Sequence, residues 1–133
     1  MYSLPVRIYW EDTDAGGVVY HARYVAFLER ARSEWMRASG HGQSALQAAG
    51  VVFAVRAMTL DFLKPARLDD AVDVTVELAE CRRASLVFRQ QALRGGERLL
   101  SATVRIASLD AATFRPMAIP AELHAHLSTL PSP

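Results

Sequence analysis

The sequence predicts an α+β domain in which one long helix packs against a five-stranded antiparallel sheet. One long segment, residues 21–39, has apolar side chains at helical spacing, whereas most of the remaining chain has the composition and alternation of β-strands. The later strands follow one another without an intervening helix, which favours antiparallel pairing. The length of 133 residues, 51% of them apolar, fits a single domain spanning residues 1–133.

The first two expected elements are a short strand and the long amphipathic helix. Residues 4–10 alternate weakly, which is typical of a strand, and end at an acidic loop. In residues 21–39, apolar side chains recur every three or four positions and charged side chains collect opposite them. Gly40 follows as a helix-ending residue, and the spacing of Arg30 and Glu34 allows an i,i+4 ion pair.

Four more strands are expected after a polar, glycine-punctuated connection that ends at Gly50. Residues 51–63 are rich in strand-forming side chains, residues 72–78 alternate cleanly, and residues 85–93 alternate less well. A last long strand contains residues 100–106, whose even-numbered positions are apolar. Strands of about ten residues span roughly 33 Å, so a curved sheet can wrap along a helix of about 28 Å.

Turns and one short helix complete the expected organisation. Gly95 and Gly96 supply the backbone freedom for a hairpin before the last strand. Residues 63–70 form the other strong turn, and the segment after Pro120 has room for a short helix. One long helix wrapped by five antiparallel strands resembles the hotdog fold.

The charge balance and the cysteine content limit the classes of function. The 15 basic and 14 acidic residues leave a formal charge of +1, so no overall field attracts nucleic acid or an anionic membrane. Cys81 is the only cysteine, which excludes an internal disulfide and a multi-thiolate metal site. No apolar run reaches the ~20 residues of a membrane span, and the N-terminus has no secretory pattern. We therefore expect a cytoplasmic protein without an integral membrane segment or a nucleic-acid partner.

The stretch EDTDAGGVVYHARY, residues 11–24, combines carboxylates, two glycines and the start of the long helix. If this loop leads into the helix, Asp14 lies close to unpaired backbone N–H groups that carry partial positive charge. Such groups can bind a substrate carbonyl oxygen and stabilise the oxyanion that develops on attack. Gly16 and Gly17 allow the backbone to approach closely. The Asp14 carboxylate can then act as nucleophile or as base on water, and a thioester suits this chemistry.

A family resemblance begins with DTDAGGVVYHARY, which is followed by FLERAR. These motifs closely resemble the acyl-CoA thioesterases of the 4-hydroxybenzoyl-CoA thioesterase type, and most of all the branch associated with the Tol-Pal cell-envelope system. KPARLDD, CRRAS and FRPMAIP extend the resemblance over most of the chain. The resemblance implies the hotdog fold and hydrolysis of a short-chain or aromatic acyl-CoA to free acid and CoA. It implies hydrolysis without a metal ion or a bound organic cofactor. CoA is here part of the substrate.

The resemblance also implies catalytic roles. The second aspartate of the family's D-x-D motif is the catalytic carboxylate, and it corresponds to Asp14. The backbone N–H that polarises the thioester at the helix start corresponds to His21, and Gly17 completes the catalytic loop. The side chain of His21 has three candidate roles, as a general acid, a pocket wall or a first-turn residue.

Substrate and subunit contacts are implied in the same way. Tyr20 and Tyr24 are expected to contact the substrate. Related enzymes carry CoA phosphate contacts at positions that correspond to Arg82, Arg83 and Arg115, and a guanidinium suits phosphate through its planar donors. The family forms homodimers by joining sheets edge to edge, often paired into tetramers, with sites at the subunit interface. Acyl carrier protein is a further candidate partner.

Structural explanations compete with these roles. Asp12 and Asp14 are both good helix-capping residues, and we interpret Asp12 as structural. A calcium loop starting at Asp12 would need a bidentate glutamate where Arg23 stands, and a P-loop would need Gly-Lys-Ser/Thr after the glycines, so both are rejected. Glu29 and Glu34 are interpreted as solvated or ion-paired helix residues.

Two other functions stay open at this stage. A hotdog hydratase or dehydratase would act on an acyl thioester with a histidine and a carboxylate from opposite subunits, an arrangement that His21 only imitates. A non-catalytic acyl-CoA or acyl-carrier-protein binding or scaffold protein of the cell envelope would use Asp14 only as a cap. Acyl preference, a covalent or general-base mechanism, the choice of dimer or tetramer and the physiological partner are not determined by the sequence.

Overall fold

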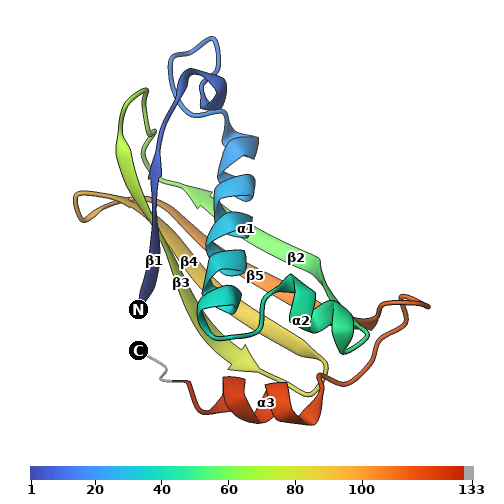
Figure 1. Ribbon diagram of the computed structural model, residues 1–133. Coiled ribbons are helices and arrows are strands. Elements are labelled where there is room, and N and C mark those ends of the chain that lie inside the picture. The colour runs from blue at the N-terminus through green and yellow to red at the C-terminus, as the bar shows by residue number, and fades with distance from the viewer. Residues whose placement is uncertain (131–133) are drawn as a thin grey trace.

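The computed structural model describes residues 1–130 and confirms the predicted α+β architecture, with one long helix lying across a five-stranded antiparallel sheet (Figure 1). The strand order is β1-β3-β4-β5-β2, so β1 and β2 form the two edges. No helix in the described part of the chain is long and apolar enough to cross a membrane. In chain order the elements are β1 (Tyr2–Arg7), η1 (Trp10–Asp12), α1 (His21–Ala38), α2 (Gln43–Ala48), β2 (Val51–Phe62), β3 (Ala71–Cys81), β4 (Ser85–Arg94), β5 (Glu97–Asp110) and α3 (Ala121–Ser128).

Helix α1 matches its predicted bounds within one residue and ends as its sequence indicates. Gly40 has φ +87°, the left-handed conformation that glycine adopts most easily. Its N–H donates to the carbonyl of Arg37 at 3.1 Å, and the N–H of His41 donates to that of Met36 at 2.9 Å. These two bonds form a Schellman motif, which satisfies carbonyl groups that the helix leaves free at its end.

The core lies between α1 and the concave face of the sheet (Figure 1). On α1, the apolar stripe predicted from the 3.6-residue period is buried through Ala31, with Phe27 and Leu28 at its centre. Trp35 is half-buried, and Ala38, at the end of the predicted stripe, is exposed. The inward-facing strand residues predicted from alternation are buried as well: Val72, Val74, Val76, Leu100, Ala102, Val104 and Ile106. Helix and sheet therefore bury each other's apolar faces along most of their length.

The first strand and the connection before β2 differ from the prediction. β1 ends at Arg7, and the chain then turns into η1, because the N–H of Tyr9 donates to Asp12 Oδ2 at 2.8 Å instead of continuing the strand ladder. The connection that was expected to be irregular contains α2. A helix of six residues is too short to produce a readable hydrophobic period.

The predicted ion pair between Arg30 and Glu34 is wrong. Glu34 pairs with Arg37 instead, while the guanidinium carbon of Arg30 lies 5.8 Å from the ring centre of Phe27. A spacing of three residues also brings helical side chains together, so sequence spacing alone does not select the partner. The expectation that Glu34 is an ion-paired surface residue is nevertheless confirmed.

The two ends of the sheet carry different parts of the chain (Figure 1). At one end, Phe62 of β2 pairs with Leu100 of β5, close to the start of α1. At the other end, Val51 of β2 pairs with Asp110 of β5, and the β3–β4 turn lies beside them. This separation decides which of the predicted site residues can meet within one chain.

Candidate active site

The loop before α1 is a tight hairpin that holds Asp14 at the start of the helix. Thr13 and Val19 form an antiparallel bridge, and the N–H of Asp14 donates to the carbonyl of Val18 at 2.9 Å. The N–H of Gly17 donates to the Asp14 carbonyl at 3.0 Å, and Gly17 adopts φ +77°, which favours glycine. Because its N–H is already bonded, Gly17 shapes the loop and has no donor left for a substrate.

The Asp14 carboxylate is exposed and oriented by the loop itself. The N–H of Gly16 donates to Asp14 Oδ1 at 2.8 Å, and this is the one hydrogen bond that the carboxylate makes within residues 1–130. A Cβ atom placed on Gly16 would stand only 3.1 Å from the same oxygen, which is closer than most real Cβ contacts. The absence of a side chain at Gly16 thus leaves room for the Asp14 carboxylate.

Asp12 is structural, as expected. The residue is 4% exposed, and its carboxylate accepts hydrogen bonds from the Tyr9 N–H at 2.8 Å and from Arg23 Nε at 2.7 Å. The bond to Asp12 raises the pKa of the Arg23 guanidinium. The Asp12 carbonyl also accepts the N–H of Tyr20 at 2.9 Å. These bonds fix the loop to the first turn of α1.

The N-terminus of α1 has no side-chain cap. Tyr20 occupies the N-cap position without a side-chain hydrogen bond to the helix, and the first turn contains no acidic residue. The first N–H groups of the helix, beginning with His21, therefore keep their partial positive charge. The His21 ring lies 4.7 Å from the ring of Tyr20 and 6.3 Å from that of Phe62, measured between centroids.

Asp14 and the start of α1 border a hollow of about 320 Å³, which we call the Asp14 pocket. Tyr24 forms part of its wall, and the Tyr24 hydroxyl accepts the N–H of Ala66 at 3.1 Å. Burial raises the pKa of the Tyr24 hydroxyl, which therefore stays protonated at neutral pH. The pocket is lined by Asp14, Val18, Val19, His21, Tyr24, Phe62, Leu63, Lys64 and Pro65.

The wall formed by residues 62–65 was not recognised in the sequence as part of the site. The sequence predicted only the end of a strand at residues 62–63 and a turn from residue 63, and the position of this wall beside Asp14 depends on pairing between β2 and β5, which no local pattern specifies. Lys64 Nζ donates to Glu97 Oε2 at 2.8 Å, and Arg94 donates to Glu97 Oε1 at 2.8 Å and to Asp70 Oδ2 at 2.7 Å. This ion cluster ties the pocket wall to the β4–β5 hairpin.

The ion cluster predicts a specific acid sensitivity. The hydrogen bond from Lys64, followed by that from Arg94, lowers the pKa of Glu97 from 4.5 to about 2. A lowered carboxyl pKa stabilises the fold above pH 4.5, and this stabilisation is lost as the pH falls toward 2. Glu97→Gln should therefore melt below wild type at pH 7, with the two melting temperatures converging between pH 4.5 and 2.

Melting curves of both proteins across this pH range measure the effect. Because Glu97 is substantially exposed, the difference should be small. Asp73→Asn, which removes an exposed carboxylate of β3 without a salt bridge in the described part of the chain, is the control. A melting difference for Glu97→Gln that is the same at pH 7 and pH 2 would contradict the assignment.

The three arginines predicted to bind CoA phosphates lie at the other end of the sheet. Arg82 pairs with Glu80 at 2.7 Å in the β3–β4 turn, the carbonyl of Arg83 accepts the N–H of Ile119, and Arg115 lies in the loop after β5. The eleven residues of β3 separate this end from the Asp14 end by about 36 Å. One chain therefore brings Asp14, Gly17, His21 and Tyr24 together but does not add Arg82, Arg83 or Arg115.

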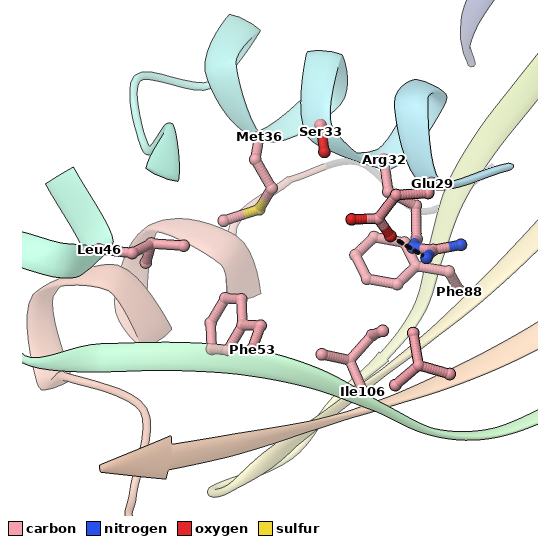
Figure 2. Close-up of a pocket in the computed structure, with 9 residues that line it drawn as sticks. Glu29, Arg32, Ser33, Met36, Leu46, Phe53, Phe88 and Ile106 are labelled. Atoms are coloured by element: carbon pink, nitrogen blue, oxygen red, sulfur yellow. Dashed lines mark hydrogen bonds and ion pairs between the residues drawn. The ribbon is translucent and has the colours of Figure 1, made fainter. Parts of the chain in front are cut away.

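A second hollow of about 330 Å³, which we call the α1–β2 pocket, lies between α1, α2 and β2 (Figure 2). Arg32 in its wall is 5% exposed, pairs with Glu29 and donates from Nη1 to Gln90 Oε1 at 2.9 Å. Burial lowers the pKa of the Arg32 guanidinium. The sequence interpretation of Glu29 as ion-paired is confirmed, but the pocket that it borders was not foreseen. The lining comprises Glu29, Arg32, Ser33, Met36, Leu46, Phe53, Val55, Phe88 and Ile106.

Comparison with known proteins identifies the class. The profile of the thioesterase-like superfamily matches residues 8–127, so the chain belongs to this superfamily of hotdog-fold thioesterases. It is 47% identical over 121 residues to the acyl-CoA thioester hydrolase YbgC of Escherichia coli, with 90% of each chain covered. It is 42% identical over 125 residues to the acyl-CoA thioesterase YbgC of Haemophilus influenzae, covering 93% of this chain and 92% of that one. The crystal structure of a probable thioesterase from Bartonella henselae matches with a TM-score of 0.84 and 35% identity, covering 90% and 98% of the two chains.

These matches confirm the family and the fold that the motifs predicted. The matched region contains both the Asp14 loop and α1, so the resemblance is not limited to the loop. The roles of individual residues are a separate question, which has to be argued from the geometry.

Proposed function

We propose that the protein hydrolyses the thioester of short-chain or aromatic acyl-CoA, releasing the free acid and CoA, with Asp14 as the catalytic carboxylate. One observation carries the proposal: an exposed carboxylate and an uncapped helix N-terminus border the same pocket. The chain belongs to the thioesterase-like superfamily, and the relatives at 47% and 42% identity are named acyl-CoA thioester hydrolases. The single cysteine fits a reducing compartment, so we place the reaction in the cytoplasm.

The proposed reaction divides the work between α1 and Asp14. The thioester carbonyl oxygen accepts a hydrogen bond from the N–H of His21, where the helix dipole favours the negative charge that develops on attack. Asp14 either takes a proton from water, whose oxygen then attacks the carbonyl carbon, or attacks that carbon itself. In both routes the C–S bond breaks, and CoA leaves as a thiolate that then takes up a proton. When Asp14 attacks directly, the acyl group remains on it as a mixed anhydride, which water then hydrolyses to release the acid and restore the carboxylate. Tyr24 forms the wall of the pocket and Gly17 the turn that presents Asp14.

A dimer through β2 would supply the phosphate contacts that one chain lacks. A two-fold axis at the β2 edge makes the two β2 strands antiparallel, which brings the Asp14 end of one copy beside the arginine end of the other. CoA bound at one copy's Asp14 would then reach Arg83 and Arg115 of the second copy, with Arg82 and the exposed Tyr20 as further contacts.

Two observations support this dimer. The outer edge of β2 has no partner strand within residues 1–130, although β2 is twelve residues long. A long strand edge with free backbone N–H and C=O groups normally pairs with another strand or is protected from doing so. The apolar side chains of Val55, Phe62 and Leu63 are exposed on or next to β2, and a dimer through this edge could bury them. The other edge strand, β1, is half as long and contains Pro5, which has no backbone N–H to donate to a further strand. Pairing of two such dimers would give a tetramer.

Acyl carrier protein is a second candidate partner, because it could present the acyl thioester in place of CoA.

Thiol release from a panel of acyl-CoAs tests the proposed activity. The panel runs from acetyl-CoA through medium and long straight chains to benzoyl-CoA, and light scattering gives the oligomeric state of the same sample. We expect turnover of short-chain or aromatic esters by a dimer or tetramer. An enoyl-CoA hydration assay serves as the comparison, since hydration without thiol release would favour a hydratase. Binding of CoA esters without turnover would favour the scaffold function.

A further inference from the structure

Arg23 places a positive charge in the first turn of α1, where a cation is unfavourable. It is the third residue of the helix, and the first turn contains no acidic residue that would balance it. The helix dipole disfavours a cation at this end, and anionic side chains are the ones that stabilise it. The position of Arg23 therefore has to be explained by contacts outside the helix.

The partners of Arg23 are two carboxylates of the segment that leads into the Asp14 loop. Arg23 Nε donates to Asp12 Oδ1 at 2.7 Å, and Nη2 lies 3.6 Å from Glu11 Oε2. The two ion pairs differ in burial, because the side chain of Asp12 is 6% exposed and that of Glu11 is 71% exposed. Solvent screens the exposed pair much more than the buried one. The contact with Asp12 is thus the one that can influence the site.

Asp12 lies against the N-terminus of α1, where the thioester carbonyl is proposed to bind. The Asp12 carbonyl accepts the N–H of Tyr20, the N-cap residue, at 2.9 Å, and the next N–H along the chain is that of His21. An unpaired carboxylate beside this end of the helix would reduce the positive potential there. It would also repel the negative charge that develops on the carbonyl oxygen during attack. The guanidinium of Arg23 offsets both effects.

Asp14 differs from these two carboxylates in its surroundings. It has no cationic partner within residues 1–130, and its carboxylate accepts only the N–H of Gly16. Arg23 thus pairs with Glu11 and Asp12 and leaves unpaired the one carboxylate of this segment that borders the Asp14 pocket. This distribution of charge suits a site in which a single carboxylate acts on the substrate.

We infer that Arg23 is a positioning residue of the active site, which neutralises Asp12 and so keeps the positive end of α1 available for the thioester carbonyl. This inference rests on the proposed function and deepens it. Arg23 does not line the Asp14 pocket, so it acts through Asp12 and not by contact with the substrate. The same ion pair also ties the loop to the helix, and the test has to separate charge from structure.

Removing the charge of Arg23 alone leaves the Asp12 carboxylate uncompensated. Arg23→Gln should lower kcat for the best substrate of the acyl-CoA panel by at least about tenfold and change KM by less than about threefold, because the repulsion grows as charge develops in the transition state. Arg37→Gln is the matched control, since it removes an arginine from an ion pair with Glu34 at the other end of the same helix. Its kcat should stay within about twofold of wild type.

Two further variants separate the charge from the tie between loop and helix. Arg23→Lys keeps the positive charge and should retain kcat within about threefold of wild type. The double variant of Asp12→Asn with Arg23→Gln removes both charges, while its two amides can still form a hydrogen bond. Its kcat should return to within about threefold of wild type. A purely structural role of the ion pair predicts the opposite, a double variant at least as slow as Arg23→Gln.

The outcomes separate failure of the inference from failure of the proposed function. Thiol release, melting temperature, circular dichroism and light scattering are measured for every variant. If wild type releases no thiol from any ester, the proposed function itself fails. If wild type is active but folded Arg23→Gln keeps its kcat, or the double variant stays as slow as Arg23→Gln, the inference is overturned and the proposed function stands. If Arg23→Gln does not fold, the double variant decides: a folded protein with near wild-type kcat supports the inference, and a slow or unfolded one overturns it.

Discussion

Asp14→Asn is expected to lower kcat for thioester hydrolysis by at least about a hundredfold while leaving the fold unchanged. The amide keeps the size of the side chain and can still accept the hydrogen bond from the Gly16 N–H through its oxygen. It cannot take a proton from water or attack a carbonyl carbon effectively. The loss should therefore fall on kcat, with little change in KM if binding precedes slow chemistry.

The measurement is steady-state thiol release with the best substrate of the acyl-CoA panel. Asp73→Asn is the matched control, because it makes the same chemical change at an exposed position that lines neither pocket. Melting temperature and oligomeric state are compared for all three proteins. If folded Asp14→Asn were as active as Asp73→Asn, Asp14 would be only a loop-forming residue.

The parts of the fold that depend on local pattern were predictable. The period of α1, the alternation of β3 and β5, and the glycine turn at Gly95 and Gly96 all come from residues close together in the sequence. The Asp14 loop belongs to the same group, because carboxylate, glycines and helix start lie within a few positions of one another.

The remaining features depend on contacts between distant segments. The pocket wall at residues 62–65 reaches Asp14 only through the register of β2 against β5. Arg32 and Gln90 are 58 positions apart and gave no signal as a pair. The separation of Asp14 and Arg115 at opposite ends of the sheet also depends on the sheet topology, which no local pattern specifies.

The second large effect is expected from the buried contact between Arg32 and Gln90. Gln90 is 1% exposed, accepts a hydrogen bond from Arg32 Nη1, and donates from Nε2 to the carbonyls of Leu28 at 3.1 Å and Thr75 at 3.3 Å. Gln90→Leu removes these bonds and leaves a buried guanidinium with fewer partners. We expect it to lower the free energy of unfolding by about 2–3 kcal/mol.

The neighbouring residue provides the control. Gln91 follows Gln90 on β4 with its side chain on the opposite face of the sheet, and its side chain makes no hydrogen bond within the described residues. Gln91→Leu should therefore change the free energy of unfolding by less than about 0.5 kcal/mol. Denaturant unfolding at one fixed protomer concentration compares the variants, because dimerisation would make stability depend on concentration.

A double variant separates the loss of a favourable contact from the cost of a stranded charge. Arg32→Met with Gln90→Leu replaces both polar partners by apolar side chains of similar length, and such replacements in protein interiors are often close to neutral. The double variant should consequently be destabilised by less than the sum of the two single changes, with a coupling energy of about 1–2 kcal/mol. Strict additivity would mean that Arg32 finds another partner when Gln90 is lost.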